Sequence, residues 1–239
     1  MIDFSTLKGL TIPEGEVLKI TRDDIDLWCV KETGIPDTYQ QVEWVKADAN
    51  VGAYLDLGFA FDKGSTIQMG FYTPNTTQAY LFGAAENSGK LRCLLTAPYD
   101  GKNLMAFYGS TGSAYVTLNG ATISLDVMNE MVATLKKGLV YYTNKTTDKS
   151  NANNIQGEYT MISNLYLFAQ NYNGTVRYGS GIRQVKYFKY YDVNGDLICD
   201  LVPCYRKSDG MIGMYDIARE TFLTNVGTGT FTKGVDVTN

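Results

Sequence analysis

The sequence predicts an all-β protein, either a sandwich or a barrel, and three observations lead to this fold class. Short runs rich in β-branched and aromatic residues recur along the chain of 239 residues. Asn-Gly, Asp-Gly and Ser-Gly pairs separate many of these runs, and 24 glycines against five prolines indicate many turns in a folded chain. Apolar spacing typical of helices is weak throughout, which disfavours architectures in which helices cover a sheet.

The N-terminal part carries its own strand patterns. Residues 16–20 and 25–30 fit two short strands joined by an Arg-Asp-Asp turn, and the Gly-Ile-Pro run at residues 34–36 is typical of a connection. We therefore place a soft boundary between Thr33 and Asp37.

This boundary divides the chain into residues 1–34, a docking or assembly segment, and residues 35–239, the sandwich. A segment this short rarely buries its apolar side chains by itself. It is expected to pack against its own sandwich, a second copy of the chain or another protein. Ile20, Leu27 and Trp28 are the candidate interface residues, with Trp28 as either an interface anchor or a core plug.

The sandwich segment contains a regular series of strand-like runs. Each run has four to nine residues, a length typical of strands in globular proteins. They occupy residues 41–47, 53–59, 65–73, 79–85, 91–96, 103–109, 114–118, 164–170, 185–192, 197–203, 211–216 and 221–224.

One region fits two different structures. Apolar residues between Leu125 and Leu135 recur at helical spacing ahead of Gly138, which could end a helix. Residues 131–143 also fit two strands joined by a Lys-Lys-Gly turn. We favour the strands because the surrounding sequence is β throughout.

Residues 200–231 hold the densest group of charged and sulfur-containing side chains, which raises the question of an active site. Asn194-Gly195 and Asp209-Gly210 each lie between two apolar runs, a pattern typical of tight hairpins with positive-φ turns. Asp209 is therefore interpreted as a turn former and the stretch as a β-meander.

Cys199 and Cys204 do not suggest a disulfide or a metal site. Five residues of extended chain span roughly 16 Å, whereas disulfide-linked Cα atoms lie about 5.5 Å apart. The chain has no histidine and no C-x-x-C pair, so we expect no metal site and no cofactor.

Charge and hydropathy exclude two kinds of partner. A net charge of −4 and a pI near 4.9 disfavour nucleic acid, whose binding depends on clustered Lys and Arg. The sequence has no basic start followed by an apolar stretch and no run of about 18 apolar residues, so we expect neither secretion nor membrane insertion. The chain is then expected in the cytosol, where thiols stay reduced.

The residues resemble a known family. Residues 164–234 resemble the C-terminal half of concanavalin A-like (laminin G-like) domains of tailed-bacteriophage virion proteins and prophages, and residues 42–71 resemble the start of the same domain. The ending "LVPCYRKSDGMIGMYD…FLTNVGTGTF" is the most specific part, and the resemblance covers about residues 39–234. Residues 9–28 more weakly resemble a segment that precedes such domains in phage tail and structural proteins.

The resemblance implies a jelly-roll sandwich of two antiparallel sheets with a short N-terminal β appendage. It also implies a non-enzymatic virion structural protein, tail-associated or on the capsid surface or a fibre, assembled in the host cytoplasm. Its expected partners are other virion proteins and a host-surface glycan, and its expected state is a homo-oligomer, with a trimer implied by the resemblance alone. The alternative is a bacterial carbohydrate-binding or adhesion module.

Catalytic patterns are missing. Glycosidases with this fold carry E-x-D-x-x-E or E-x-D-x-E on one strand, because an acid and a nucleophile must flank the scissile bond, and neither pattern occurs. The nearest acidic groups are Glu14 with Glu16 and the run from Asp126 to Glu130. The absence of histidine removes Ser-His and Cys-His chemistry. We expect no enzymatic activity.

Oxygen-rich turns at residues 99–103 and 191–196 could hold calcium, but turn formation explains both and is favoured. The candidate ligand-binding residues are Tyr172, Arg177 and Tyr178 in the Asn/Gly-rich loop at residues 169–181, where they could stack on and hydrogen-bond a sugar. An ordinary hairpin loop whose tyrosines fold back on the sheet is the favoured interpretation, and sugar binding is the alternative.

Overall fold

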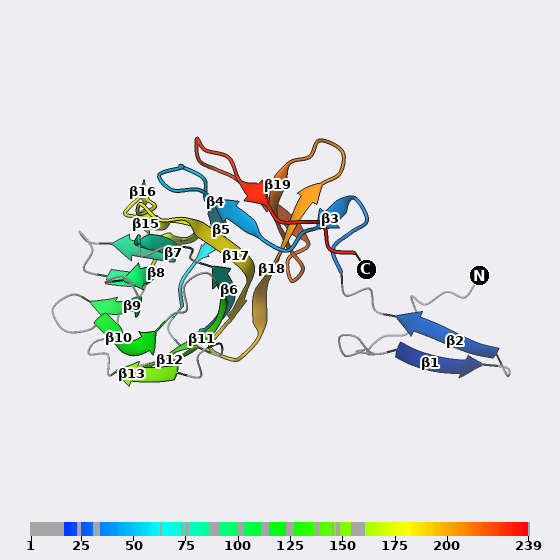
Figure 1. Ribbon diagram of the computed structural model, residues 1–239. Helices are drawn as coiled ribbons and strands as arrows, with labels where there is room; N and C mark the ends of the chain where they lie inside the picture. The colour runs from blue at the N-terminus through cyan, green and yellow to red at the C-terminus, as the bar shows by residue number, and fades with distance from the viewer. Residues whose placement is uncertain are drawn as a thin grey trace. The chain divides into compact units, whose positions relative to one another are not determined.

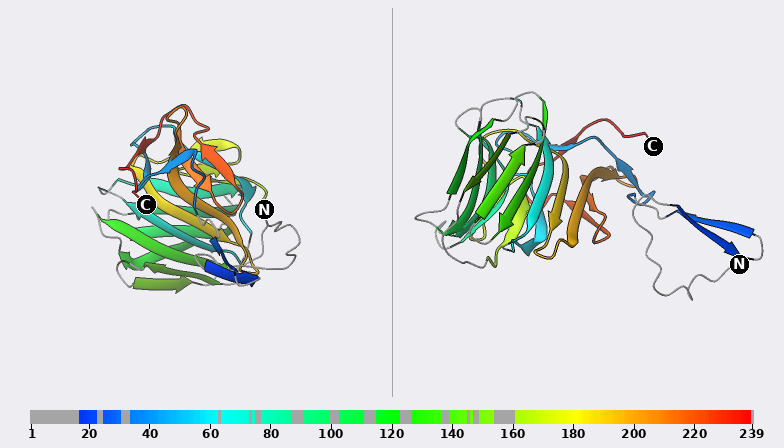
Figure 2. Two further views of the ribbon diagram at one scale, coloured as in Figure 1. Left: turned by 90° about the vertical axis from the view of Figure 1, so that its right-hand side faces the viewer. Right: turned by 90° about the horizontal axis from the view of Figure 1, so that it is seen from below.

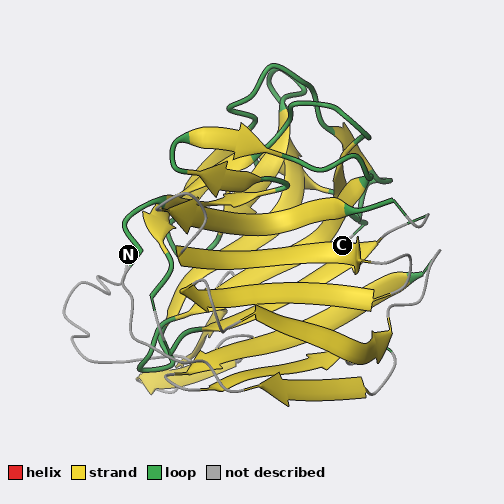
Figure 3. Ribbon diagram, turned by 90° about the vertical axis from the view of Figure 1, so that its left-hand side faces the viewer, coloured by secondary structure: helices red, strands yellow, loops and turns green. Residues whose placement is uncertain are grey.

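A computed structural model gives the structure of the chain. It describes residues 17–22, 25–30, 34–62, 64–72, 74, 77–86, 91–99, 103–110, 115–122, 127–136, 139–144, 146, 149–153 and 161–238. Every regular element in these ranges is a β-strand, which confirms the predicted all-β class (Figure 3). None of the described residues forms a helix long and apolar enough to cross a membrane. The chain separates into two compact units, Met1–Pro36 and Asp37–Asn239.

The first unit contains one antiparallel hairpin of β1 (Val17–Arg22) and β2 (Ile25–Val30), so both strands predicted there are present. Ile20 is registered opposite Leu27, and Trp28 is registered opposite Lys19. An isolated two-stranded hairpin is at best marginally stable in water. The interface role of Ile20, Leu27 and Trp28 stays a prediction.

The second unit is a jelly-roll sandwich of two sheets (Figure 1). In the described part of the chain, the first sheet has eight strands in the order β10-β9-β8-β7-β14-β5, with β15 paired to β7 and β16 paired to β15. Its strands are β5 (Leu55–Ala60), β7 (Ala79–Glu86), β8 (Leu91–Tyr99), β9 (Asn103–Ser110), β10 (Tyr115–Thr122), β14 (Asn164–Leu167), β15 (Gln170–Tyr172) and β16 (Thr175–Arg177).

The second sheet has eleven strands. Its main order is β13-β12-β11-β6-β17-β18-β19-β20, and β3, β4 and β21 pair at its side. Its strands are β3 (Tyr39–Gln41), β4 (Val45–Ala47), β6 (Thr66–Tyr72), β11 (Met128–Lys136), β12 (Leu139–Asn144), β13 (Lys149–Asn153), β17 (Arg183–Tyr191), β18 (Leu197–Arg206), β19 (Ile212–Asp216), β20 (Thr221–Thr224) and β21 (Thr232–Lys233).

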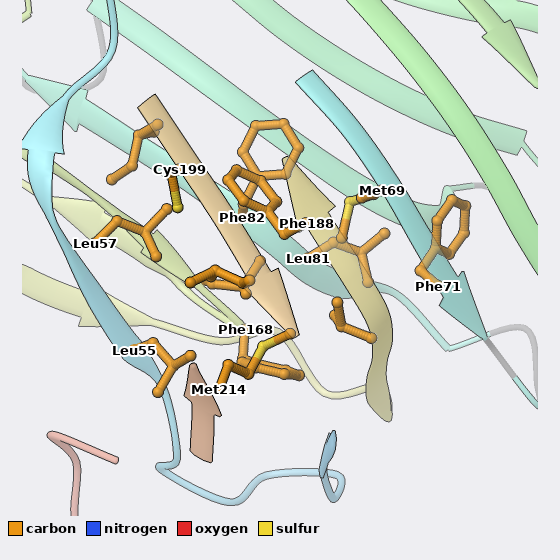
Figure 4. Close-up of a cluster of buried hydrophobic side chains, with 14 of the residues drawn as sticks. Leu55, Leu57, Met69, Phe71, Leu81, Phe82, Phe168, Phe188, Cys199 and Met214 are labelled. Atoms are coloured by element: carbon orange, nitrogen blue, oxygen red, sulfur yellow. The ribbon is translucent and has the colours of Figure 1, made fainter. Parts of the chain in front are cut away.

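The two sheets form two layers over a common apolar core (Figure 2). Phe82 of β7 and Phe188 of β17 meet there, with ring centroids 5.8 Å apart, so the core joins the sheets (Figure 4). Strict alternation along β17 would place Val185 and Phe188 on opposite faces, yet both are buried. The register with β6 shifts between Val185 and Tyr187, and this bulge turns both side chains to the core.

The sandwich differs from the sequence prediction in several elements. The single run at residues 41–47 is two short strands, β3 and β4, and the strands β13, β16 and β21 were not predicted. Their sequences are short and polar, without the apolar alternation that marks a half-buried strand. The hairpin interpretation of residues 131–143 is confirmed, since β11 pairs antiparallel with β12.

The predicted meander is present, because β17, β18, β19 and β20 pair in sequence order. Gly195 and Gly210 have φ of 91° and 70°, as turn formation requires. The turns are longer than the two-residue type, since the hydrogen bonds from Asp192 N to Asp196 O and from Arg206 N to Met211 O enclose residues 193–195 and 207–210. Only the glycine has positive φ in each turn.

Candidate functional site

The β15–β16 hairpin carries two of the predicted ligand-binding residues. Its turn, Asn173-Gly174, has positive φ at both positions, 50° and 85°, which is the geometry of a two-residue turn matched to strand twist. Asn171 fixes the turn from inside: its side chain accepts a hydrogen bond from Gly174 N at 2.9 Å and donates one to Asn164 O at 3.0 Å. The hairpin is therefore a rigid element with defined geometry.

The hairpin adds a parallel contact to an otherwise antiparallel sheet. After β14 the chain reverses at Phe168, whose φ of 68° lies in the left-handed region, and β15 then pairs parallel with β7. Asn173 N donates to Ala85 O at 2.8 Å and ties the turn to the end of β7. This arrangement presents the hairpin at one end of the sheet.

Tyr172 and Arg177 form a stacked pair on the hairpin. The guanidinium carbon of Arg177 lies 3.4 Å from the centroid of the Tyr172 ring, within the range of a cation–π contact. Arg177 is exposed and Tyr172 is half-buried. One ring face is thus covered by a fixed positive charge, and a polar ligand could approach the guanidinium edge.

Tyr178 belongs to a different group of contacts. Its carbonyl accepts hydrogen bonds from Tyr80 N and from Arg183 Nη1, both at 3.2 Å. A Cβ built on Gly52 would lie 3.1 Å from the Tyr178 hydroxyl, so the side chain reaches the loop between β4 and β5. The structure therefore brings Tyr172 and Arg177 together and places Tyr178 against a neighbouring loop.

Arg183 organises this end of the sandwich and was not predicted from the sequence. Its side chain is 0% exposed, and its Nη2 donates to the carbonyls of Asp48 at 2.8 Å and Val51 at 2.7 Å. Among the described residues, its Nε has no hydrogen-bond partner. Burial lowers the pKa of Arg183 to about 10, which still leaves it charged at neutral pH. The strand pattern gave no signal for it, since arginine is usually solvated.

The buried carboxylates of the described part have structural partners. Glu86 accepts hydrogen bonds from the backbone N–H groups of Ile162 and Ser163. Asp200 pairs with Lys189 Nζ at 2.8 Å. Each carboxylate therefore already stabilises a fold contact.

The charged stretch at residues 200–231 is built in the same way. Asp209 Oδ2 pairs with Arg206 Nη2 at 2.6 Å on the exposed turn, and Asp209 Oδ1 accepts a hydrogen bond from Met211 N. The Arg206 side chain lowers the pKa of Asp209 below its usual range. Asp209 thus acts in the turn, as predicted. Cys199 and Cys204 are both buried and both free thiols.

One of the two candidate calcium turns, at residues 191–196, lies in the described part of the chain. Asp192 Oδ1 accepts hydrogen bonds from Asn194 N and Asp196 N, so this turn uses its own carboxylate. Within the described ranges, no three His, Cys, Asp or Glu side chains gather into a metal-binding group. Glu14, Glu16, Asp126 and most of the turn at 99–103 lie outside the described residues.

Comparisons with known proteins support the fold. No family model and no curated protein matches the chain. The native heptameric pentraxin of Limulus polyphemus matches with a TM-score of 0.50 at 11% identity, covering 84% of this chain and 97% of the pentraxin. At that identity the likeness shows a shared fold alone, in agreement with the two-sheet jelly-roll arrangement.

Two further solved structures have lower scores. Domains LG4–5 of the mouse laminin α1 chain give a TM-score of 0.47 at 14% identity, covering 71% of this chain and 45% of that chain. A tailspike protein of an Escherichia coli O157:H7 bacteriophage gives 0.35 at 13% identity, covering 82% of this chain and 28% of the tailspike. Similarities of this strength do not bear on the function of this chain.

Proposed function

We propose that this chain is a non-enzymatic structural protein of a bacteriophage virion, associated with the tail or displayed on the capsid surface or a fibre. Its sandwich binds a host-surface glycan or another receptor. The observation that carries the binding role is the rigid β15–β16 hairpin, which presents Tyr172 and Arg177 as a stacked pair. Aromatic rings and guanidinium groups on a fixed scaffold are typical of sites that recognise polar ligands.

The occupied carboxylates support a binding role over catalysis. General acid catalysis needs a carboxyl group that can reach a substrate and exchange a proton. Glu86 and Asp200 are buried and hydrogen-bonded to their own chain. A hydrolase would need an acid pair elsewhere in the molecule.

The virion assignment rests on the resemblance of residues 39–234 to phage domains. In this proposal the β1–β2 hairpin docks the chain to other virion proteins or to copies of itself, through Ile20, Leu27 and Trp28. A trimer is the state that the resemblance implies. Closed symmetric homo-oligomers are the common form of such assemblies.

Mass spectrometry of gradient-purified phage particles tests the location. Peptides of this chain should be present in stoichiometric amounts in the particles, and antibodies should label the tail or the capsid surface in electron micrographs. Finding the chain on the bacterial surface and not in particles would instead support a bacterial adhesion module.

Binding of the labelled full chain to host cells tests the receptor role. Arg177→Ala should reduce binding because it removes the guanidinium above Tyr172. Arg206→Ala is the matched control, since Arg206 is also a surface arginine but lies on the β18–β19 turn. Equal binding by both variants would argue against the hairpin as the receptor site.

A further inference from the structure

A second group of polar and aromatic side chains lies on the outer face of β5. Leu55 and Leu57 point into the core, and Ala53, Leu55 and Leu57 are each 0% exposed (Figure 4). Asp56 alternates with Leu55 and Leu57 and therefore lies on the outer face of β5, where it is half-buried. Tyr54, just before the strand, is half-buried and also packs against the core.

The neighbouring strand β14 completes this face on one side. Tyr166 is registered opposite Asp56, and its ring centroid lies 4.6 Å from that of Tyr54 with an interplanar angle of 32°. Asn164 Nδ2 donates to Asp56 Oδ1 at 3.0 Å. On the other side of Tyr166 the opposing residue of β7 is Gly83, which has no side chain to cover the ring.

Asp56 keeps one oxygen available. Its Oδ1 accepts hydrogen bonds from Asn164 Nδ2 and, at 2.8 Å, from Gly58 N, which hold the carboxylate in place. Among the residues that the structure describes, no hydrogen bond or ion pair is made by Asp56 Oδ2. A carboxylate oxygen fixed in this way can accept hydrogen bonds from ligand hydroxyl groups.

Two glycines connect this face to Tyr178. A Cβ built on Gly52 would lie 3.1 Å from the Tyr178 hydroxyl and 3.0 Å from Thr228 Oγ1. A Cβ on Gly227 would lie 3.1 Å from Tyr54 Cδ1. The absence of side chains at both positions lets the loops meet closely, with Tyr178 and Thr228 beside Gly52 and Tyr54 beside Gly227.

We propose that this surface, the tyrosine strip, binds a neutral sugar chain along its length. The inference rests on the proposed receptor-binding function and names its ligand class. The strip consists of Tyr54, Asp56, Asn164, Tyr166, Tyr178 and Thr228.

The chemistry of the strip selects this occupant. Tyrosine rings are large, rigid and amphipathic, so they pack against the apolar faces of sugar rings at low entropic cost. Asp56 Oδ2, Thr228 and the tyrosine hydroxyls can exchange hydrogen bonds with sugar hydroxyls. The charged residue of the strip is Asp56, so a negative charge on the ligand would be repelled and would lose its solvation. An acidic sugar chain is therefore disfavoured.

Arg183 positions one end of the strip. Its guanidinium holds the carbonyls of Tyr178, Asp48 and Val51, so the loop beside Gly52 is ordered before any ligand binds. Binding to an ordered surface avoids part of the entropic cost of association. Arg183 is fully buried and acts as a positioning residue.

Calorimetric titration of the full chain tests the inference. The probes are neutral hexasaccharides of glucose, galactose and mannose, with oligogalacturonate as the acidic counterpart. We expect a neutral hexasaccharide to bind, and Tyr166→Ala to weaken it about fivefold or more, as the loss of one aromatic contact predicts. Asp56→Asn, which keeps the Oδ1 contacts and removes the free carboxylate oxygen, should also weaken it.

Two variants serve as controls. Tyr166→Phe keeps the ring and removes only the hydroxyl, so it should weaken binding less than Tyr166→Ala does. Tyr205→Ala removes a half-buried tyrosine from β18 in the other sheet and should leave binding unchanged. Thermal melts show whether each variant is folded, and if Tyr166→Ala does not fold, Asp56→Asn with Tyr166→Phe decides the result.

Three outcomes would overturn the inference. In the first, folded Asp56→Asn and Tyr166→Ala bind as the unmodified chain does, while Arg177→Ala loses binding. This result would place the ligand on the β15–β16 hairpin and leave the proposed function intact. Preference for oligogalacturonate would contradict a neutral ligand. If the full chain binds none of the probes, a neutral sugar chain is excluded as the ligand of the strip. The particle and cell-binding experiments would still decide the proposed function by themselves.

Discussion

Replacing Arg183 with methionine removes three hydrogen bonds from a fully buried guanidinium and leaves a shorter, apolar side chain. Among the described residues the Val51 carbonyl then has no hydrogen-bond partner, which costs about 1–3 kcal/mol. The Asp48 and Tyr178 carbonyls keep the hydrogen bonds from Val51 N and Tyr80 N, so each lost guanidinium bond there costs about 0.5–1.5 kcal/mol. Removing a buried charge returns part of this cost, because no carboxylate hydrogen-bonds the guanidinium and its burial is itself unfavourable. We expect a net loss of about 2–4 kcal/mol in the free energy of unfolding.

Urea unfolding followed by tryptophan fluorescence measures this change. A loss of about 3 kcal/mol would also lower the melting temperature by about 6–12 °C in a domain of this size. Arg183→Lys keeps the charge, but a single ammonium lacks the planar guanidinium that reaches several carbonyls. The stability of Arg183→Lys should therefore lie between that of the unmodified chain and that of Arg183→Met.

A free energy of unfolding for Arg183→Met within about 0.5 kcal/mol of the unmodified chain would refute the reasoning, because surface substitutions without a structural role give changes of that size. It would mean that the loop beside Val51 and the carbonyl of Tyr178 are held by other contacts. The ordered end of the tyrosine strip would then need a different explanation.

Four further predictions concern other parts of the chain. Gly210→Val should lower the free energy of unfolding by about 1–3 kcal/mol, because a β-branched residue is strained at a φ of 70°. Arg206→Ala should change the melting temperature little. If thermal melts showed Arg206→Ala to be the more destabilising variant, the turn assignment would be wrong. NMR titration of Asp209 should give a pKa below the usual carboxyl range, and this pKa should rise in Arg206→Ala. The stabilisation from the Arg206–Asp209 pair should be present above the ordinary carboxyl pKa and be lost as the pH falls through the lowered pKa of Asp209. Burial raises the pKa of Cys204 to about 12, so iodoacetamide at pH 8 should leave this thiol unmodified in the folded chain. The same reagent should alkylate Cys204 in urea, and peptide mass spectrometry measures the modification in both states. Deleting residues 1–31 should convert an oligomer into a folded monomer by light scattering, while an insoluble product would show that the segment belongs to the sandwich core.

The sequence predicted the fold class because local signals agree along most of the chain. Turn residues at Gly195 and Gly210 and apolar alternation in the flanking runs define the meander from β17 to β20. The strands that were not predicted, such as β13 and β16, are short and contribute few apolar residues. Their pairing depends on a neighbouring strand edge, which local sequence does not reveal.

The candidate site was only partly accessible to sequence reasoning. Tyr172 and Arg177 were predicted from a polar, aromatic loop, and they do meet in the structure. Arg183 was not recognised because its partners Asp48 and Val51 precede it by 135 and 132 residues. Composition shows which side chains are available, whereas the convergence of distant loops appears only in three dimensions.

The same argument explains why the charged stretch at residues 200–231 looks like an active site in the sequence. Asp216 is 0% exposed and accepts hydrogen bonds from Asp200 N and from Arg219 Nε. Arg219 also donates to Leu57 O at 2.6 Å, so this ion pair connects the meander to β5 of the other sheet. A general acid needs an oxygen that can exchange a proton with a substrate, and the contacts of Asp216 are to its own chain. The Asp216–Arg219 pair therefore joins the two sheets, and the proposed ligand sites lie elsewhere, on side chains of β5, β14 and the β15–β16 hairpin.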